Sequence, residues 1–86
     1  MEQSLKIVYF AWVRERLGKD EETVTVTGES KVSDIVDMLK NRDAAYLGVF
    51  DDLTNLRFAL DQDFVSTSAS IGVARELAIF PPVTGG

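Results

Sequence analysis

The stretch SKVSDIVDMLK, residues 30–40, decides the fold expected for this chain. Within it, four apolar residues recur at the spacing i, i+3, i+4 and i+7: Val32, Ile35, Val36 and Leu39. This spacing places their side chains on one face of a helix, which Ser30 is expected to cap and which should run to Lys40 or Asn41. Because the apolar face has to be buried, the helix is expected to pack on a sheet built by the flanking segments.

Strands are expected on both sides of this helix. Five segments have the β-branched, aromatic or alternating composition of strands: 5–11, 22–27, 56–60, 64–65 and 75–80. The first and last of them are the most apolar, which favours their being neighbours at the centre of the sheet. We therefore predict an α+β fold: a mixed sheet of four to five strands with one main helix packed on one face.

Shorter features connect these elements. Residues 12–17 are expected to form a helical turn that ends at Gly18 in the left-handed conformation, and the charged residues 19–22 predict a loop. Residues 44–52 leave two alternatives open, a short second helix or an apolar loop that closes the core. Residues 61–63 predict a turn between two short strands.

Composition limits the possible functions. The chain has 86 residues, enough for one domain, and a net charge of −5 that would repel a nucleic-acid backbone. It has neither cysteine nor histidine, which excludes disulfides, thiolate sites and histidine-dependent catalysis, and we expect no bound metal. The sequence shows no signal peptide and no membrane span, so a cytoplasmic location without membrane partners is expected.

The last seven residues, FPPVTGG, follow the final apolar segment directly. Two prolines make a stiff spacer, and the residues after them bury too little surface to offset the entropy of ordering them. We therefore predict a domain over residues 1–82 and a flexible tail over residues 83–86. A terminal Gly-Gly can also be meaningless fraying sequence or a cloning remnant.

The ionised α-carboxylate of Gly86 is the reactive group of this tail. A carboxylate can attack the α-phosphate of a nucleotide, and the acyl-adenylate so formed can accept a sulfur, oxygen or nitrogen nucleophile. Gly85 and Gly86 lack a Cβ, which lets an active site close on the backbone from both sides. The tail is therefore a candidate site for loading and transferring a group.

Three segments carry a resemblance to a known family: KIVYFAWVRERLG (residues 6–18), VSDIVDMLK (32–40) and above all ELAIFPPVTGG (76–86). The chain resembles the small subunit of molybdopterin synthase, a ubiquitin-like β-grasp sulfur carrier. The resemblance implies that a ubiquitin-activating-type enzyme adenylates Gly86 with ATP and converts it to a thiocarboxylate. The tail then enters the large synthase subunit, in an expected heterotetramer, and supplies the sulfur for the dithiolene formed on cyclic pyranopterin monophosphate. No cofactor is expected on this chain, which would have no catalysis of its own in isolation.

The same resemblance implies roles for single residues. Gly86 would bear the sulfur, Gly85 would be the slender neck, and Val83 and Thr84 would line the partner's tunnel. The docking anchors would be Phe80, Pro81 and Pro82. From the strand pattern itself, Val8 and Phe10 with Ala78 and Phe80 are the best candidates for an exposed apolar patch, and contiguous patches of this kind tend to be interfaces.

Two departures from the family and several alternatives stay open. Relatives often have an Asp-Gly-Asp turn where this chain has Val73, Ala74 and Arg75, and an Asn near Asp61, which puts local geometry and partner choice in doubt. Thiazole formation in thiamine synthesis and tRNA thiolation are alternatives within the carrier class, although the Pro-Pro-Val-Thr stretch favours the molybdopterin route. A ubiquitin-like modifier or a plain interaction module is the alternative from another class.

Overall fold

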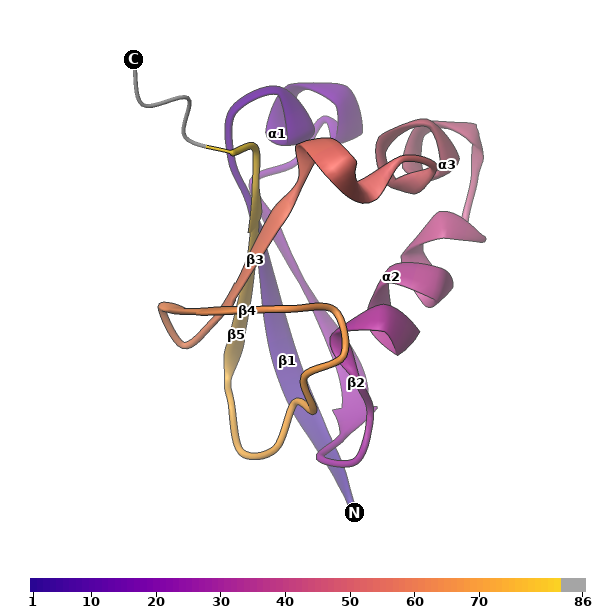
Figure 1. Ribbon diagram of the computed structural model, residues 1–86. Coiled ribbons are helices and arrows are strands. Elements are labelled where there is room, and N and C mark those ends of the chain that lie inside the picture. The colour runs from indigo at the N-terminus through magenta and orange to yellow at the C-terminus, as the bar shows by residue number, and fades with distance from the viewer. Residues whose placement is uncertain (83–86) are drawn as a thin grey trace.

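The computed structural model describes residues 1–82 as helices, strands and the turns between them (Figure 1). The predicted tail, residues 83–86, lies outside the described residues, so the division into domain and tail stays a prediction. Along the chain the elements are β1 (Glu2–Tyr9), α1 (Ala11–Leu17), β2 (Glu21–Thr27), α2 (Val32–Lys40), α3 (Ala44–Phe50), the 3-10 turn η1 (Leu53–Asn55), β3 (Arg57–Leu60), β4 (Asp63–Val65) and β5 (Glu76–Phe80).

The strands form one five-stranded mixed sheet in the order β2-β1-β5-β3-β4. The first and last strands are parallel neighbours in its middle, with Ile7 opposite Leu77 and Tyr9 opposite Ile79. The other pairs, β1 with β2, β3 with β5 and β3 with β4, are antiparallel. The predicted mixed sheet and its central pair are therefore confirmed.

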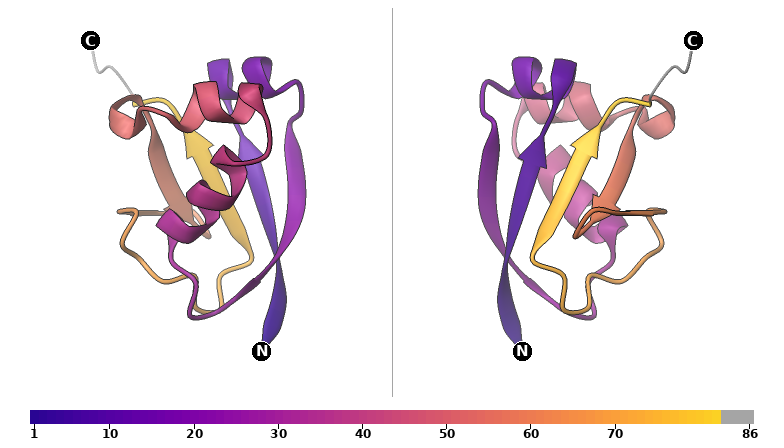
Figure 2. Two further views of the ribbon diagram at one scale, coloured as in Figure 1. Left: turned by 90° about the vertical axis from the view of Figure 1, so that its right-hand side faces the viewer. Right: turned by 90° about the vertical axis from the view of Figure 1, so that its left-hand side faces the viewer.

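Helix α2 packs its apolar stripe on one face of this sheet, as predicted (Figure 2). The four stripe residues are buried in one cluster with alternate residues of the two central strands: Leu5, Ile7, Leu77 and Ile79. Burying one such aliphatic side chain contributes about 1.5–3 kcal/mol, so this contact is a main source of stability. The opposite face of the sheet carries no helix of residues 1–82 (Figure 2).

Helix α2 begins later than predicted, and Ser30 is not its N-cap. The helix starts at Val32, with Lys31 as the N-cap residue in an extended conformation. The backbone N–H of Lys31 donates to the Asp34 carboxylate at 2.9 Å, so an acidic side chain inside the first turn stabilises the helix start. Ser30 instead belongs to the preceding turn, where its hydroxyl lies 3.1 Å from the Thr27 hydroxyl.

The bounds of the first two strands also differ from the prediction. β1 begins at Glu2 because its polar first residues pair with the end of β2, Glu2 lying opposite Thr27. It ends at Tyr9, two residues before the predicted end, since α1 begins at Ala11. The predicted charged loop over residues 19–22 is half wrong, because β2 already starts at Glu21.

Helices α1 and α3 lie near the carboxyl ends of β1 and β5 (Figure 1). Helix α1 ends, as predicted, at Gly18, which has φ 73° in the left-handed region. Of the two alternatives for residues 44–52, the helix is correct: Asp43 caps α3 by accepting the backbone N–H groups of Ala45 and Tyr46 at 2.9 and 3.1 Å. None of the helices within residues 1–82 is long and apolar enough to cross a bilayer.

The turn between β3 and β4 also fixes the start of β5. Asp61 and Gln62 form the predicted turn with φ of 46° and 74°. The Asp61 carboxylate accepts the backbone N–H groups of Arg75 and Glu76, both at 3.0 Å. At the departure over residues 73–75, the N–H of Ala74 donates to the carbonyl of Ile71 at 3.0 Å, so a turn forms without the family's Asp-Gly-Asp sequence.

Candidate functional site

Strand β5 leads directly into the segment for which a function was predicted. It occupies the middle of the sheet and ends at Phe80, and Pro81 and Pro82 follow it at the same end of the molecule as α1 (Figure 1). We call Pro81 and Pro82 the arm root. Both are half-buried, and their rings fix φ near −65°, so the chain leaves the sheet in a defined direction. The predicted site residues Val83, Thr84, Gly85 and Gly86 lie outside the described residues.

A row of apolar side chains crosses the helix-free face of the sheet below the arm root. The register aligns Val8 with Ala78, Ala78 with Ala59, and Ala59 with Phe64, so the row spans β1, β5, β3 and β4. Alternation along β3 sends Phe58 to the core and Ala59 to this row. Ala59 is nevertheless only 4% exposed, which shows how closely the row packs.

Three aromatic rings complete this surface. Phe64 is 79% exposed, and its ring centroid lies 5.5 Å from that of the half-buried Phe80, with the planes inclined by 42°. Phe10, at the end of β1, is 44% exposed, and its N–H donates to the carbonyl of Ile79 at 3.2 Å. We call the whole surface the apolar sheet face. It consists of Val8, Phe10, Ala59, Phe64, Ala78 and Phe80.

The structure therefore brings the predicted patch residues Val8, Phe10, Ala78 and Phe80 onto one face beside Pro81. That this face binds a partner stays a prediction. Phe64 is the largest exposed part of the surface and was missed, because which face a residue of a short edge strand occupies depends on pairing that the sequence does not reveal.

Two cationic groups at the border of the apolar sheet face, those of Lys6 and Arg57, are paired with a carboxylate or with backbone carbonyls. Lys6 Nζ lies 3.4 Å from Glu21 Oε2 in a solvent-exposed ion pair. The guanidinium of Arg57, whose backbone lies opposite Phe80, donates to the carbonyls of Thr54 and Leu56 at 3.2 and 2.8 Å. The middle of the face is thus uncharged, as is typical of the core of a protein interface.

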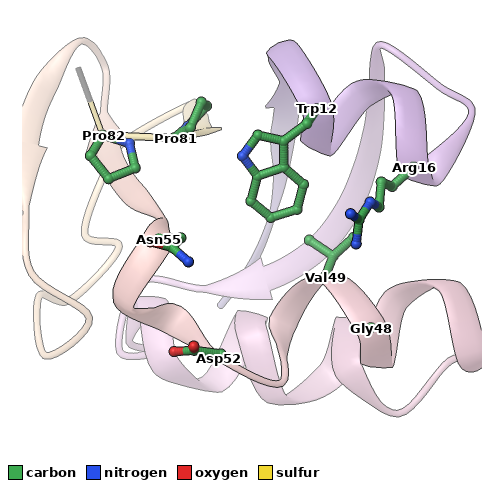
Figure 3. A pocket seen from close by; sticks show the side chains of 8 residues that line it. All are labelled: Trp12, Arg16, Gly48, Val49, Asp52, Asn55, Pro81 and Pro82. Atoms are coloured by element: carbon green, nitrogen blue, oxygen red, sulfur yellow. The ribbon is translucent and has the colours of Figure 1, made fainter. Parts of the chain in front are cut away.

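A groove borders the arm root on the helical side of the molecule (Figure 3). It lies between α1, α3, η1 and the arm root and has a volume of about 480 Å³. Its lining residues are Trp12, Arg16, Gly48, Val49, Asp52, Asn55, Pro81 and Pro82. The arm root is therefore flanked by the apolar sheet face on one side and by this groove on the other.

A polar cluster that sequence reasoning missed joins three segments at the edge of the core. The Glu22 carboxylate accepts hydrogen bonds from the hydroxyls of Tyr9 and Tyr46, both at 2.7 Å, and from the Arg42 guanidinium. Lys19 Nζ lies 3.9 Å from the same carboxylate. Sequence alternation places Tyr9 on the core side of β1, but the other members of the cluster come from β2, from the segment between α2 and α3, and from α3 itself.

The pKa values in this cluster follow from its contacts. Burial raises the pKa of Tyr9 well above its ordinary value, and the hydrogen bond to Glu22 raises it further. For Glu22, burial opposes ionisation, but the hydrogen bonds from Arg42 and the two tyrosines outweigh burial and hold its pKa below its ordinary value. The hydrogen bond that Arg42 donates to the Glu22 carboxylate also raises the pKa of Arg42. The cluster therefore ties α3 to the sheet through an ionised carboxylate.

Replacing Glu22 by Gln is expected to lower the free energy of unfolding by about 1–2 kcal/mol at neutral pH, because charge-assisted hydrogen bonds are lost. Since the folded state holds the pKa of Glu22 below its ordinary value of 4.5, its stabilising effect is present above that pH and is lost as the pH falls. Urea unfolding at several pH values should therefore show a weaker loss of stability on acidification in E22Q than in the wild type.

The matched control is Glu21→Gln, which removes the same charge from the neighbouring residue. Glu21 makes an exposed ion pair with Lys6, and such pairs contribute about 0–1 kcal/mol. Equal stability losses and equal acid profiles for E21Q and E22Q would contradict the role given to the cluster.

No group of three or more acidic, histidine or cysteine side chains among residues 1–82 is arranged to hold a metal ion. The chain contains no histidine and no cysteine, so the usual general base and the usual thiol nucleophile are both missing. The chemistry that this chain can offer itself is therefore confined to carboxylates, hydroxyls, amines and the chain terminus.

The chain is similar to known proteins in both sequence and fold. The model of the ThiS family matches residues 7–86. A Pyrococcus furiosus structure described as molybdopterin converting factor subunit 1 is 24% identical with a TM-score of 0.75, covering 93% of this chain and 98% of that one. The modifier protein SAMP1 of Haloferax volcanii is also 24% identical, with a TM-score of 0.68 and coverage of 98% and 100%.

A third structural relative establishes the wider fold. The ubiquitin of Caldiarchaeum subterraneum matches with a TM-score of 0.61 at 10% identity, and both chains are covered completely. At identities this low the three structures speak for the fold alone, which is the predicted ubiquitin-like β-grasp. The family match, by contrast, extends over nearly the whole sequence, and the chain belongs to the ThiS family of ubiquitin-like sulfur carriers.

Proposed function

We propose that this protein is the sulfur-carrier subunit of a molybdopterin synthase, with Gly86 as the residue that carries the sulfur. The observation that carries the proposal is the position of the arm root. The central strand β5 passes through the apolar sheet face and continues into Pro81 and Pro82 without a turn. A partner bound to that face would receive the residues that follow the two prolines.

The chemistry of loading begins with the carboxylate of Gly86. One of its oxygens attacks the α-phosphorus of ATP in the active site of an adenylating enzyme, and pyrophosphate leaves. A sulfide ion (HS⁻) then attacks the acyl carbon, AMP leaves, and loss of the sulfur-bound proton gives the thiocarboxylate. ATP is bound and used by the activating enzyme, and this chain is its substrate.

Transfer takes place in the large synthase subunit. The thiocarboxylate sulfur attacks a side-chain carbon of cyclic pyranopterin monophosphate and displaces an oxygen substituent, and water then cleaves the acyl–sulfur bond and returns Gly86 as a carboxylate. Two transfers supply both sulfur atoms of the dithiolene, in agreement with a heterotetramer of two small and two large subunits. The acid–base groups belong to the large subunit, since this chain has neither histidine nor cysteine.

Family membership and one structural relative support this route. The ThiS family match reaches Gly86, and the Pyrococcus furiosus relative is described as molybdopterin converting factor subunit 1. Gly85 and Gly86 present a backbone without a Cβ, which suits a narrow tunnel, and the exposed rings of Phe10 and Phe64 suit a permanent or frequent partner.

Intact-mass spectrometry tests the proposal. Co-expressed with the adenylating enzyme and a sulfur source, the chain is expected to gain about 16 Da, because one carboxylate oxygen is replaced by sulfur. Purified with the large subunit, the loaded chain should convert cyclic pyranopterin monophosphate and return to its original mass. A chain that stays unloaded under these conditions would contradict the proposal.

The similarity to the modifier protein SAMP1 favours a second candidate, a ubiquitin-like modifier. Adenylated Gly86 would then be attacked by a lysine amine of another protein, and an isopeptide bond would form as AMP leaves. The same mass experiment separates the two, because a modifier appears on other proteins as a lysine conjugate that lacks sulfur.

A further inference from the structure

We infer that the groove beside the arm root receives a long basic side chain, lysine or arginine, from the large synthase subunit. The inference rests on the proposed function and adds to it a second contact on the helical side of the molecule. Its starting point is geometric: Pro81 and Pro82 form one wall of the groove and also follow directly on the apolar sheet face. A partner that encloses the arm root on all sides must therefore cover both the groove and the apolar sheet face.

The groove combines apolar walls with one anionic end. Trp12 from α1 and Val49 from α3 line its middle, and Asp52 and Asn55 lie at the end toward Pro82 (Figure 3). Apolar walls fit the methylene stem of a lysine or arginine, and the oxygens of Asp52 and Asn55 fit its cationic head. A volume of about 480 Å³ gives room for an entire side chain.

The carboxylate of Asp52 can accept a cation through one of its two oxygens. Both hydrogen bonds from Thr54, from its backbone N–H at 3.0 Å and its hydroxyl at 2.7 Å, go to Oδ1. These bonds hold the pKa of Asp52 below its ordinary value, so the carboxylate is ionised at neutral pH. No side chain or backbone group of residues 1–82 donates to Oδ2, and Asp52 takes part in none of the ion pairs of these residues.

Arg16 lies in the same groove but does not neutralise Asp52. Its guanidinium lies 5.3 Å from the centroid of the Trp12 ring, on the side away from Asp52 and Asn55 (Figure 3). The chain as a whole carries 14 acidic and 9 basic residues, so its field attracts a basic surface. Both the local and the overall charge therefore favour a cationic occupant over an anionic one.

Binding to the purified large subunit from the same genome, measured by calorimetry, tests the inference with two charge variants. Asp52→Asn keeps the acceptor for Thr54 and removes the charge, and we expect it to weaken binding about 10-fold at low salt. Arg16→Glu makes the groove more acidic, so binding should be unchanged or tighter. The matched control is Asp51→Asn, which removes an equal charge from the neighbouring residue outside the groove lining and should change affinity less than about 2-fold.

A spectroscopic readout reports on the groove itself. The chain has one tryptophan, so its indole N–H gives a single signal in the ¹⁵N-labelled protein. That signal is expected to shift when unlabelled large subunit is added, and less so for D52N at equal occupancy.

Three results would overturn the inference. Equal affinities of D52N and D51N would remove the role of Asp52, and weaker binding by R16E together with normal binding by D52N would indicate an acidic occupant. If the indole signal of Trp12 does not shift at saturation, the groove lies outside the interface. In each case the proposed function survives if the chain still gains sulfur at Gly86, whereas a wild-type chain that neither gains sulfur nor binds the large subunit contradicts both.

Discussion

Deletion of Gly86 is expected to abolish sulfur loading and sulfur transfer completely while the fold stays intact. The deletion places the carboxylate one residue short of the position where both partners act, and an error of about 3.3–3.6 Å at the reacting atom removes the advantage of positioning. The mass gain of about 16 Da should be absent, and dithiolene formation should fall below detection. The stability of the domain should not change, because every core residue within the described residues 1–82 lies at or before Ile79.

The comparison variant is Gly86→Ala, which keeps a carboxylate at the correct distance and adds a single Cβ. We expect it to be loaded more slowly than the wild type but to retain some activity. If the deletion variant were loaded and active at the wild-type rate, Gly86 would not be the carrier residue and the proposed function would fail.

Phe10→Ala is expected to weaken binding of the large subunit about 30-fold or more, which corresponds to about 2 kcal/mol. Exposed aromatic side chains often contribute most of the binding energy of an interface, and Phe10 is the member of the apolar sheet face that directly precedes the first turn of α1. Calorimetry or surface plasmon resonance with the purified large subunit measures the effect.

Leu47→Ala on α3 is the matched control. Leu47 is 47% exposed and Phe10 is 44% exposed, so a partner can reach the two apolar side chains to a similar degree. Leu47 is outside the apolar sheet face and outside the lining of the groove, and its truncation should leave affinity within about 2-fold of the wild type. Equal losses for the two variants would mean that the apolar sheet face is not the docking surface.

Local periodicity was enough to predict the main helix and the mixed sheet. The apolar stripe of Val32, Ile35, Val36 and Leu39 predicts both the main helix and the face that it buries. Its helical spacing can be seen in a single short stretch of sequence, without knowledge of distant segments. The apolar character of the first and last strands likewise follows from their central positions, where both faces of a strand are covered or in contact with other apolar groups.

Features that depend on distant segments were not accessible in this way. The sequence of residues 2–4 is polar and shows no strand pattern. These residues form part of β1 because β2 supplies pairing partners as far as Thr27. The start of α2 was misplaced for a similar reason. Both Ser30 and Asp34 are suitable capping groups, and the turn that engages Ser30 with Thr27 leaves Asp34 to stabilise the helix.

The same distinction holds for the site. The patch residues Val8, Phe10, Ala78 and Phe80 could be proposed because they alternate along the apolar parts of the first and last strands. Phe64 could not, because it joins them only through the pairing of β4 with β3 and of β3 with β5. The polar cluster at Glu22 and the groove at Asp52 each gather residues from several segments, so composition gives no signal for either.

The place of β5 in the sheet has a consequence for biosynthesis. β5 lies between β1 and β3, so a nascent chain that has not yet reached Glu76 has two separate antiparallel strand pairs with no strand to join them. Ile7 and Phe58 would then remain open to solvent until Leu77 and Ile79 arrive from the ribosome. Folding of this domain therefore waits for translation of its last strand, and interrupted translation products would be left as substrates for proteolysis.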